Sequence, residues 1–436
     1  MVTSKEVKAR HDKVMFPCTA NFYEEAIALE SGEGTRLTDV DGNRYLDFFG
    51  GILTVSVGHS NPRVNAAVKG QIDRLGHVST LYPTIPLVEL AEKLVAITPG
   101  KLDRVYFTAS GTEADETAVA LAQLHTGSNE LIALRHGYSG RSLLAQSLTA
   151  HSGYRGVQTQ VAGIKHAQAP YCYRCPFGKK PDSCALECAT DIEDLIQTTT
   201  TGRIAGFLAE PIMGVGGFIT PPKDYFKVAV EIVRRYGGVF IADEVQSGFG
   251  RTGAKWWGID QYDVEPDLMT MAKGIANGAA LGACITNPEI ADSLKGKPNL
   301  STFGGTPVTS VAGLATIEVM EEEDIRGRSK ERGAQLRAGL DDLKKRHSII
   351  GDVRGLGLMQ ALELVADEPN KDRRPHPKAA NALLEAARRR GLLIGKGGLY
   401  GNTMRIAPPM LVSASEVDDA IRLIGESLDE IRGVGL

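Results

Sequence analysis

The stretch IADEVQSGFGRTG, residues 241–253, places two acids directly after an apolar run and before a glycine-rich basic turn. The short apolar run from Val239 to Ala242 predicts a buried strand. A buried strand gains nothing from carboxylates at its tip, whereas a ligand site at that tip would use them. Asp243 is therefore a candidate site residue, although alone it is better explained as a helix cap or a surface salt bridge.

Predicted strands and helices alternate on both sides of this stretch. RIAGFLAE (residues 203–210) and DLMTMAK (residues 267–273) predict two more buried strands. PPKDYFKVAVEIVRRYGG (residues 221–238) predicts an amphipathic helix with Asp224 at its N-cap and Gly237 at its end. This alternation predicts an α/β fold with a mostly parallel sheet flanked by helices. Ligands of such sheets bind beyond the carboxyl ends of the strands, so the strand tips should meet at one crevice.

The chain has 436 residues, which is long for one core of ordinary size. From about residue 319 the pattern changes to long charged helices between shorter strands, whose charge runs we interpret as solvated helix faces. We predict a large domain over residues 61–318 and a smaller α+β domain over residues 319–436. The N-terminal segment 1–60 is expected to join the smaller domain, which would then be built from both chain ends.

Composition and charge argue against several classes of protein. Hydrophobic residues make up 42% and charged residues 23%, as in ordinary globular proteins. A net charge of −4 is not that of a general nucleic-acid binder. No apolar run reaches the roughly 18 residues of a membrane span, and residues 1–17 lack the apolar segment of a secretory signal. We therefore expect a cytoplasmic protein without nucleic-acid or membrane partners.

Four of the six cysteines lie close together in YCYRCPFGKKPDSCALEC, residues 171–188. Cys172 and Cys175 have the spacing of a zinc-ligand pair, and Cys184 and Cys188 follow them. The linking segment is short and contains no histidine, so reduced thiols of a surface insertion, or packing cysteines, explain the pattern better. We predict no metal here, with a four-cysteine metal site as the alternative.

Two further strand ends carry chemically useful residues. SGTEADE (residues 110–116) follows a predicted strand, and Ser110, Gly111 and Thr112 combine hydroxyls with the free N–H groups of a helix start. This arrangement suits a phosphate, although a simple capping turn is the alternative. Lys273 ends another predicted strand among small residues. A partly buried amine has a lowered pKa and attacks carbonyl groups, although a lysine that snorkels from a strand end would look the same.

Taken together, these residues indicate pyridoxal 5′-phosphate. Enzymes hold this cofactor with a lysine that forms a Schiff base, an Asp that keeps the pyridine nitrogen protonated, and a phosphate site. Lys273, Asp243 and residues 110–112 have these properties. Tyr138, in HGYSGR, would supply an aromatic face for the ring, a contact worth about 1 kcal/mol. Asp243 would then end its strand where a cofactor nitrogen is bound.

A series of motifs runs from about Thr38 to Met410: DVDGNRYLDFFGGI, GHSNPRV, SGTEA, HGYSGR, AEPIMGVGGF, IADEVQSGFGRTG, DLMTMAKGIANG, STFGGTP, GDVRGLGLM and RIAPPM. In this order they resemble the class III, or omega-type, aminotransferases, which belong to the fold-type-I pyridoxal-phosphate enzymes. The resemblance implies a large domain with a mostly parallel sheet and a smaller α+β domain. The cysteine segment lies outside the shared pattern.

The resemblance also implies roles at the cofactor. Lys273 would carry the cofactor and move the proton between the substrate and cofactor carbons, and Asp243 would bind the pyridine nitrogen. Gln246 would contact the phenolic oxygen, while Val245 and Tyr138 would pack on opposite faces of the ring.

The same resemblance implies how the phosphate is bound. Gly111 and Thr112, with Ser110, would form the phosphate cradle. Thr302, in STFGG, would come from the neighbouring subunit. The enzyme would then be a homodimer with shared active sites, or a tetramer of such dimers.

Substrate residues follow from the resemblance as well. Arg405 would grip an α-carboxylate in a two-pronged manner, and Glu210 would pair with Arg405 when a substrate lacks that carboxylate. Arg141 would hold a distal carboxylate, and Ile52 would form an apolar wall. For each arginine an ordinary salt bridge is the alternative. We predict ping-pong transfer from an ω-amino acid such as 4-aminobutyrate, or a related amine, to 2-oxoglutarate.

Other reactions stay open at this point. Residues 214–253 and 391–410 also resemble the alanine–glyoxylate branch of the class, so alanine or β-amino acid donors with glyoxylate or pyruvate are an alternative. A racemase or aminomutase on the same scaffold is another. A nicotinamide oxidoreductase is disfavoured, because the nearest glycine motif, RGLGLMQA, has Gln360 in the third glycine position. A DNA-binding regulator is disfavoured by the short N-terminal segment, which is not notably basic.

Overall fold

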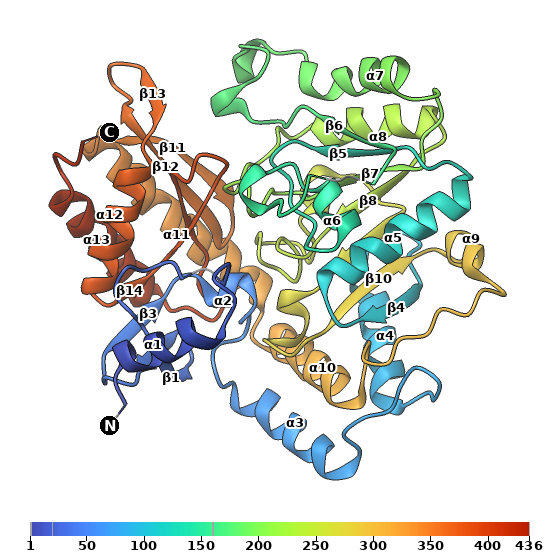
Figure 1. Cartoon of the computed structure of the whole chain (residues 1–436), viewed down its shortest axis with the longest axis horizontal. Coiled ribbons are helices and arrows are strands. Elements are labelled where there is room, and N and C mark those ends of the chain that lie inside the picture. Colours follow the sequence, from blue (N-terminus) through green and yellow to red (C-terminus); the bar gives the residue numbers. More distant parts are fainter. Residues whose placement is uncertain (1, 20, 159–160, 436) are drawn as a thin grey trace.

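The computed structural model describes residues 2–19, 21–158 and 161–435. Figure 1 shows two parts side by side: a large sheet with helices around it at right, and a smaller assembly of strands and helices at left. The blue N-terminal elements lie with the orange and red C-terminal elements in the smaller part. The predicted α/β fold, with a smaller domain built from both chain ends, is confirmed.

A seven-stranded sheet in the order β4-β10-β9-β8-β7-β5-β6 forms the centre of the larger part. Strands β6, β5, β7, β8 and β9 pair in parallel, whereas β10 is antiparallel to both of its neighbours. The carboxyl ends of the parallel strands therefore lie at one edge of the sheet. The strands are β4 (Arg104–Thr108), β5 (Leu131–Leu134), β6 (Ile164–Ala167), β7 (Gly206–Ala209), β8 (Val239–Asp243), β9 (Leu268–Met271) and β10 (Gly282–Thr286).

Helices bury both faces of this sheet. Helix α5 (Gly111–Thr126) packs in one hydrophobic cluster with Leu208 and Ile241. The adjacent strand residues Phe207 and Phe240 belong to the other cluster, together with α7 (Glu187–Thr199) and α8 (Tyr225–Arg235). Because successive side chains of a strand point to opposite faces, α5 covers one face and the α7–α8 pair covers the other.

Three further helices, α3 (Pro62–Arg74), α4 (Ile85–Ile97) and α10 (Pro307–Glu322), pack against one another beside the sheet. The shorter helices α6 (Leu143–Leu148) and α9 (Pro288–Ala291) lie against α5. The domain limit that we predict at residue 318 falls within α10. The limits at residues 60 and 318 stay predictions.

Two smaller sheets form the other part. In the first, β3 pairs in parallel with β14 through Leu46 and Leu392, so strands from the two chain ends join. Its strands are β1 (Leu29–Glu33), β2 (Arg36–Asp39), β3 (Arg44–Asp47) and β14 (Leu392–Leu393); the second contains β11 (Ile350–Leu356), β12 (Met359–Asp367), β16 (Thr403–Ile406) and β15 (Gly395–Gly397), with β13 (Asp372–Pro375) on β12. Helices α11 (Ile325–Arg346), α12 (Pro377–Arg389) and α13 (Ala414–Glu430) cover them.

The helix boundaries add detail to the sequence-based predictions. Asp224 is the N-cap residue of α8, but its side chain makes no capping hydrogen bond. Gly237 follows the helix with φ +76°, a conformation that glycine adopts without strain. The charged region after residue 319 is not one helix, because α10 ends at Glu322 and Asp324 starts α11 by accepting from the Gly327 N–H at 3.3 Å.

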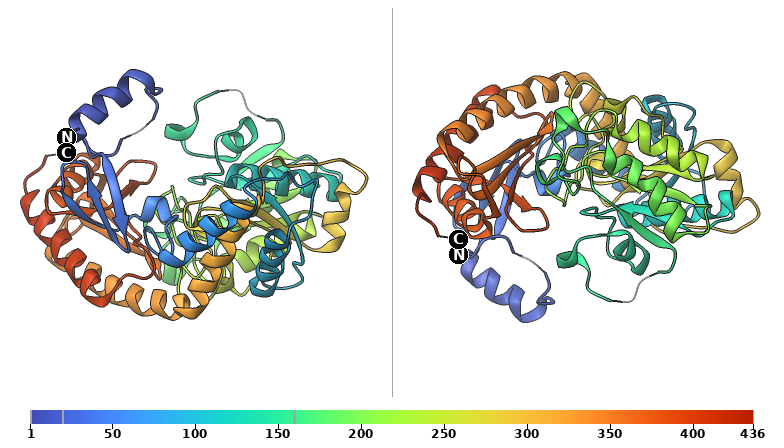
Figure 2. Two further views of the ribbon diagram at one scale, coloured as in Figure 1. Left: turned by 90° about the horizontal axis from the view of Figure 1, so that it is seen from below. Right: turned by 90° about the horizontal axis from the view of Figure 1, so that it is seen from above.

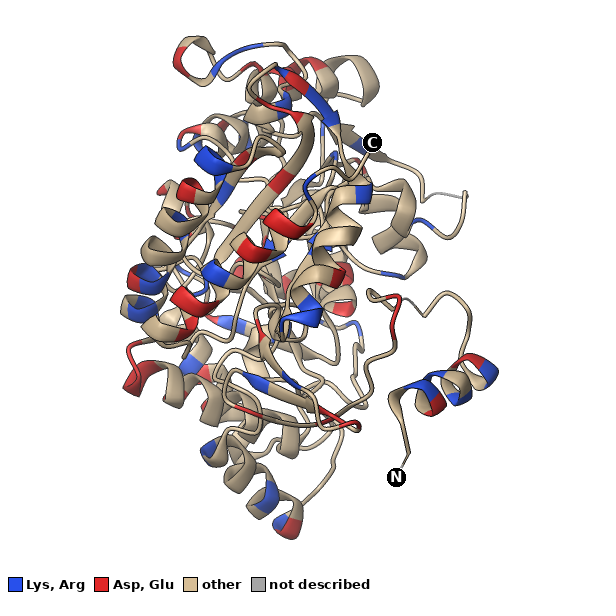
Figure 3. Cartoon of the chain, turned by 90° about the vertical axis from the view of Figure 1, so that its left-hand side faces the viewer, with Lys and Arg blue, Asp and Glu red and all other residues tan. Residues whose placement is uncertain are grey.

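Helix α1 (Ser4–Val14) stands away from the rest of the chain in both views of Figure 2. Thr3 and Glu6 form a reciprocal capping box at its start. Figure 3 shows acidic and basic residues next to one another along this helix. Phe16, which follows the helix in the chain, is 80% exposed. Within the described ranges, no helix has the length and apolar character needed to cross a lipid bilayer.

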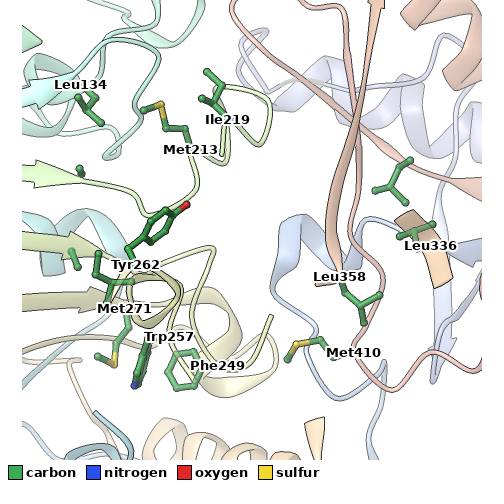
Figure 4. Close-up of a cluster of buried hydrophobic side chains, with 14 of the residues drawn as sticks. Leu134, Met213, Ile219, Phe249, Trp257, Tyr262, Met271, Leu336, Leu358 and Met410 are labelled. Carbon is green, nitrogen blue, oxygen red and sulfur yellow. The ribbon is translucent and has the colours of Figure 1, made fainter. Parts of the chain in front are cut away.

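One continuous hydrophobic cluster runs through both parts of the molecule. In Figure 4, Phe249 and Trp257 lie side by side, with ring centroids 4.9 Å apart. Leu358 and Met410, from the C-terminal part, lie on the other side of the same view. The two parts therefore share a core instead of forming separate globules.

Candidate active site

The carboxyl edge of the seven-stranded sheet encloses a cavity of about 330 Å³. Loops after β5, β7, β8 and β9 and the first turn of α5 contribute its walls. The cavity is lined by Gly111, Thr112, Asp115, Tyr138, Ser139, Gly140, Arg141, Glu210, Asp243, Val245, Gln246, Ala272 and Lys273. Most of the residues that the sequence indicated, from distant parts of the chain, thus lie around one space.

The two acids at the end of β8 have different environments. Asp243 lines the cavity, is 3% exposed, and accepts one hydrogen bond from the Val245 N–H at 3.0 Å. Glu244 lies outside the cavity lining and accepts from the N–H groups of Gly258 and Ile259 at 2.9 and 2.7 Å. Burial raises the pKa of Asp243 to about 6 and that of Glu244 to about 7. Asp243 is therefore available to a ligand, whereas Glu244 holds the following loop.

Lys273 lies two residues after the end of β9 and lines the same cavity. Its φ of +43° is unusual for a residue with a side chain and turns the chain sharply after the strand. Burial lowers the pKa of its amine, Arg405 lowers it further, and Asp243 and Glu210 oppose the shift. A buried amine with a lowered pKa has a larger neutral, nucleophilic fraction near neutral pH.

Glu210, directly after β7, is a second buried carboxyl of the cavity. It accepts hydrogen bonds from the N–H groups of Tyr138 at 3.1 Å and Gly214 at 2.7 Å. Burial and the neighbouring Asp243 raise its pKa to about 8. Glu210 makes no ion pair with Arg405 in the described part of the chain, so the pairing that the resemblance implies is not formed here.

Asp115 is the third of these carboxyls, and the sequence analysis did not select it. It lies in α5, four residues after Gly111, and is 1% exposed. The Thr270 hydroxyl donates to its Oδ1 at 2.6 Å. The signal was present in SGTEADE, since residues four apart on a helix lie on the same face. We call Asp115, Glu210 and Asp243 the three cavity carboxyls.

The first turn of α5 presents the features of an anion-binding site, namely free backbone N–H groups at a helix start. Ser110 is its N-cap and accepts from the Glu113 N–H at 3.3 Å, so its hydroxyl caps the helix. Gly111 and Thr112 line the cavity. Their N–H groups have no hydrogen-bond partner among the described residues. Free N–H groups at a helix start attract phosphate.

Close packing around this turn favours glycine at residue 111 and requires it at residue 140. A Cβ on Gly111 would lie 3.2 Å from a Val245 methyl carbon, and one on Gly140 would lie 2.1 Å from the Thr112 hydroxyl oxygen. Gly140 also has φ +131°, which L side chains rarely adopt. At these glycines the backbone itself forms the cavity wall, so a phosphate could approach the N–H groups closely.

The remaining cofactor residues also line the cavity. Tyr138, half-buried, follows β5, and Val245 and Gln246 follow β8. The buried Gln246 Oε1 has no hydrogen-bond partner among the described atoms. A polar atom left unpaired at a cavity wall indicates a ligand group that would bind it.

The two predicted substrate arginines lie in contrasting environments. Arg141 is exposed and lines the cavity, and its guanidinium has no ion pair within the described residues. Arg405, in β16, is 2% exposed, and its guanidinium carbon lies 4.8 Å from the Phe49 ring centre and 5.8 Å from that of Phe218. It does not line the cavity directly, but its charge acts on Lys273.

Thr302 and Ile52 lie outside the cavity lining of this chain. Thr302 is exposed and lines a separate depression with Phe303 and Leu300. Ile52, in α2 (Gly50–Leu53), is 43% exposed with φ +66°. Helix α2 contacts the turn that begins at Lys273, so Ile52 is near the site without facing the cavity.

The four cysteines of residues 171–188 line one small cavity, separate from the lining of the cavity at the sheet edge. All are free thiols, and burial, then the neighbouring thiols, raise the pKa of Cys188 to about 12. No three His, Cys, Asp or Glu side chains in the described ranges are placed to hold a metal ion.

The residues present fit pyridoxal 5′-phosphate. A buried lysine, an acid at a strand end, an aromatic side chain, an unpaired amide oxygen and free helix N–H groups surround a single space. Each matches one functional group of the cofactor: the aldehyde, the ring nitrogen, the ring face, the phenolic oxygen and the phosphate.

Comparison with known proteins places these observations in a family. The family model for aminotransferase class-III matches residues 19–428. An alanine–glyoxylate aminotransferase 2 homolog, mitochondrial, from Arabidopsis thaliana is 40% identical over 98% of this chain and 87% of its own length. A leucine/methionine racemase from Thermococcus litoralis is 33% identical, covering 98% and 96%. A probable 4-aminobutyrate aminotransferase from Bacillus subtilis is 34% identical, covering 91% and 92%.

Solved structures give the same fold. A crystal structure of an amine transaminase from an uncultivated Pseudomonas species, in the PLP-bound (internal aldimine) form, superposes with a TM-score of 0.88 and 31% identity. It covers 96% of this chain and 98% of that one.

Proposed function

Because this chain belongs to the class III aminotransferases, which use pyridoxal 5′-phosphate, we propose that it moves an amino group from an ω-amino acid to 2-oxoglutarate. The donor is of the 4-aminobutyrate type or a related amine, and the two half-reactions share one site in a ping-pong sequence. The observation that carries this proposal is Arg141, an exposed arginine without an ion pair in the described residues that lines the cofactor cavity.

In this proposal each residue has a defined task. The cofactor supplies an aldehyde that binds amines and a cationic ring that stabilises negative charge at the adjacent carbon. Lys273 holds the cofactor and then, as a neutral amine, moves the substrate proton. Asp243 keeps the ring nitrogen protonated, Gln246 pairs the phenolic oxygen, and Tyr138 and Val245 fix the ring plane.

Two arginines distinguish acceptors by their number of carboxylates. A guanidinium binds a carboxylate through two parallel hydrogen bonds. Arg405 would take the α-carboxylate and Arg141 the distal one, so a dicarboxylic oxo acid uses both. Glu210 accepts hydrogen bonds from two backbone N–H groups, and Arg405 has no carboxylate partner among the described residues, so its guanidinium is available to a substrate carboxylate.

An acceptor panel tests the proposal. Arg141→Ala should lower kcat/KM for 2-oxoglutarate by about 10–100-fold, the effect of losing a charge-assisted hydrogen bond of about 1.5–3 kcal/mol. The same change should affect pyruvate and glyoxylate little. Arg104→Ala, at an exposed arginine on β4, is the matched control. An equal loss for all three acceptors would make Arg141 a structural residue and reject the proposal.

A second candidate is transfer from alanine or a β-amino acid to glyoxylate or pyruvate. The 40% identity to the Arabidopsis alanine–glyoxylate aminotransferase homolog favours it. Wild-type activity with glyoxylate and none with 2-oxoglutarate would select this candidate. Incubation with donor alone separates both from a racemase: stoichiometric release of oxo product indicates transamination, whereas return of the spectrum with isomerised donor indicates racemisation.

We also propose a homodimer whose partner supplies Thr302. Thr302 lies among exposed apolar side chains that a second copy would cover: Leu81, Tyr82, Ile85, Leu300 and Phe303, each at least 62% exposed. The Thr80 hydroxyl donates to the Ser301 carbonyl at 3.1 Å, so the segments around residues 80 and 301 lie side by side. Tyr82→Asp should give a monomer that loses cofactor, by light scattering and absorbance. Leu124→Asp, on α5, is the control, and a dimeric Tyr82→Asp variant contradicts the interface.

A further inference from the structure

Asp115 is a buried acid in the cofactor cavity that has no part in the roles above. It lies one turn into α5, behind the phosphate turn, and lines the cavity with Asp243, Glu210 and Lys273. At 1% exposure it is the most buried of the three cavity carboxyls. A buried carboxyl at such a place needs a physical explanation.

Among the described residues, the hydrogen bond of the Asp115 side chain, from Thr270 Oγ1 to Oδ1 at 2.6 Å, connects it to the strands that carry the catalytic groups. Thr270 in β9 is paired with Asp243 in β8, and its carbonyl accepts from the Glu244 N–H at 2.9 Å. Lys273 follows Thr270 by three residues. Asp115 therefore holds the strand segment from which both Asp243 and Lys273 project.

The three cavity carboxyls differ in what stabilises a negative charge. Glu210 accepts from two backbone N–H groups and Asp243 from one. Asp115 accepts only from the hydroxyl of Thr270 among the described residues. Neighbouring carboxylates in a low-dielectric site do not all ionise, and a carboxyl that accepts from no N–H group has little to stabilise its charge and keeps its proton.

The titratable groups around Asp115 also favour its neutral form. From β8, β7 and the turn after β9 it faces Asp243, Glu210 and Lys273, and from β10 the Cys284 thiol. Burial raises the pKa of Asp115 well above its ordinary range, and the negative charge of Asp243 raises it further. Burial also raises the pKa of Cys284, so that thiol adds no charge.

We propose that Asp115 is a positioning residue that stays protonated in the working enzyme and, through Thr270, holds Asp243 and Lys273 in place. As a neutral acid it leaves Asp243 as the ionised group that faces the cofactor ring nitrogen. An anion at residue 115 would oppose the ionisation of Asp243 and stabilise the charged form of Lys273.

Two variants of the holoenzyme test the charge and the contact separately. Asp115→Asn is neutral and can still accept from Thr270, so the pH midpoint of the absorbance change of the bound cofactor should stay as in the wild type. If Asp115 were an anion, its loss would lower that midpoint by about one unit. Such a downward shift would overturn the proposal.

Asp115→Ala removes the acceptor, and we expect cofactor retention in dialysis to weaken by about 5–10-fold relative to Asp115→Asn. Thr270→Val should have the same effect, and the two changes together should cost no more than one. Retention in Asp115→Ala equal to the wild type would reject the positioning role.

A measurement on the wild type removes dependence on the folding of the variants. In holoenzyme labelled with ¹³C-aspartate, the infrared band of a protonated carboxylic acid should persist at about pH 8, where ordinary aspartates are ionised. Absence of that band would overturn the proposal even if Asp115→Asn did not fold.

Discussion

Two groups of buried charges in this molecule are arranged in opposite ways. The three cavity carboxyls have few partners: a single N–H, a pair of N–H groups and a hydroxyl. The second group, which we call the Glu363 cluster, consists of Tyr171, Arg174, Asp352, Arg354 and Glu363. There Glu363 is paired with Arg354 at 2.6 Å and Arg174 at 2.5 Å, and the Tyr171 hydroxyl donates to it.

The difference in pairing distinguishes a candidate active site from a group of charges that stabilises the contact between two parts of the fold. The Glu363 cluster connects the cysteine segment to β11 and β12 of the smaller part, and Arg354 also donates to the Gly217 carbonyl at 2.8 Å. Burial alone would raise the pKa of Glu363, but Arg354 and Arg174 hold it below its ordinary range. Burial instead raises the pKa values of the cavity carboxyls, because none of them is paired with an arginine among the described residues.

The largest expected effect comes from the cavity. Lys273→Ala should reduce turnover by about 10⁴-fold or more, since the same amine holds the cofactor and transfers the proton. The visible absorbance of the lysine-bound cofactor should disappear while the fold persists. Kinetics and absorbance spectra check this, with Lys69→Ala on α3 as the control. Retained turnover would contradict the role of Lys273.

Asp243 and Glu244 allow the same comparison between a cavity acid and a structural acid at two adjacent residues. Asp243→Asn should slow proton abstraction by about 10²–10³-fold, because the ring nitrogen loses its anionic partner. Glu244→Gln should leave that step nearly unchanged but lower the free energy of unfolding by about 1–3 kcal/mol. The reason is that the N–H groups of Gly258 and Ile259 and the Ser247 hydroxyl lose a full acceptor. Substrate deuterium isotope effects and urea unfolding separate the two outcomes. Similar kinetic losses in both variants would mean that the two acids have no separate tasks.

Substitutions in the Glu363 cluster should change the free energy of unfolding and leave the catalysed reaction nearly unchanged. Arg354→Met should lower the free energy of unfolding by about 3–5 kcal/mol, because it leaves Glu363 buried without its main partner. The folded-state pKa of Glu363 lies below 4.5, so its contribution is full above about pH 4.5 and is lost as the pH falls through the folded value. Urea unfolding at several pH values measures this. Arg373→Met, an exposed pair with Glu368, is the control.

The smallest effect should have the opposite pH dependence. Glu210 has a folded-state pKa of about 8 against an ordinary 4.5, so it favours folding below about pH 4.5 and this contribution is lost as the pH rises through 8. In cofactor-free protein, Glu210→Gln should therefore become more stable relative to the wild type between these values, by at least about 1 kcal/mol. A stability difference that does not change with pH would show that Glu210 is ionised without cost.

Much of the site could be predicted from the sequence because strand ends are local features. Asp243, Lys273 and the turn at Ser110 each follow an apolar run, and the parallel sheet brings such ends to one edge. Asp115 was missed because its role depends on Thr270, a residue of a neighbouring strand 155 positions away. Thr302 matched a motif, but a single chain does not bring it to the cavity.

What the sequence determined by itself is the order of strands and helices, the mostly parallel sheet and the identity of the groups at its carboxyl edge. These follow from hydrophobic period and from residue type, which act over short distances along the chain. Only the tertiary structure decided that Glu244, the acid next to Asp243, lies outside the cavity lining and holds a loop. It also decided that Arg405 is buried near two aromatic rings, whereas Arg141 is exposed and has no ion pair among the described residues, because burial and partners come from residues far apart in sequence.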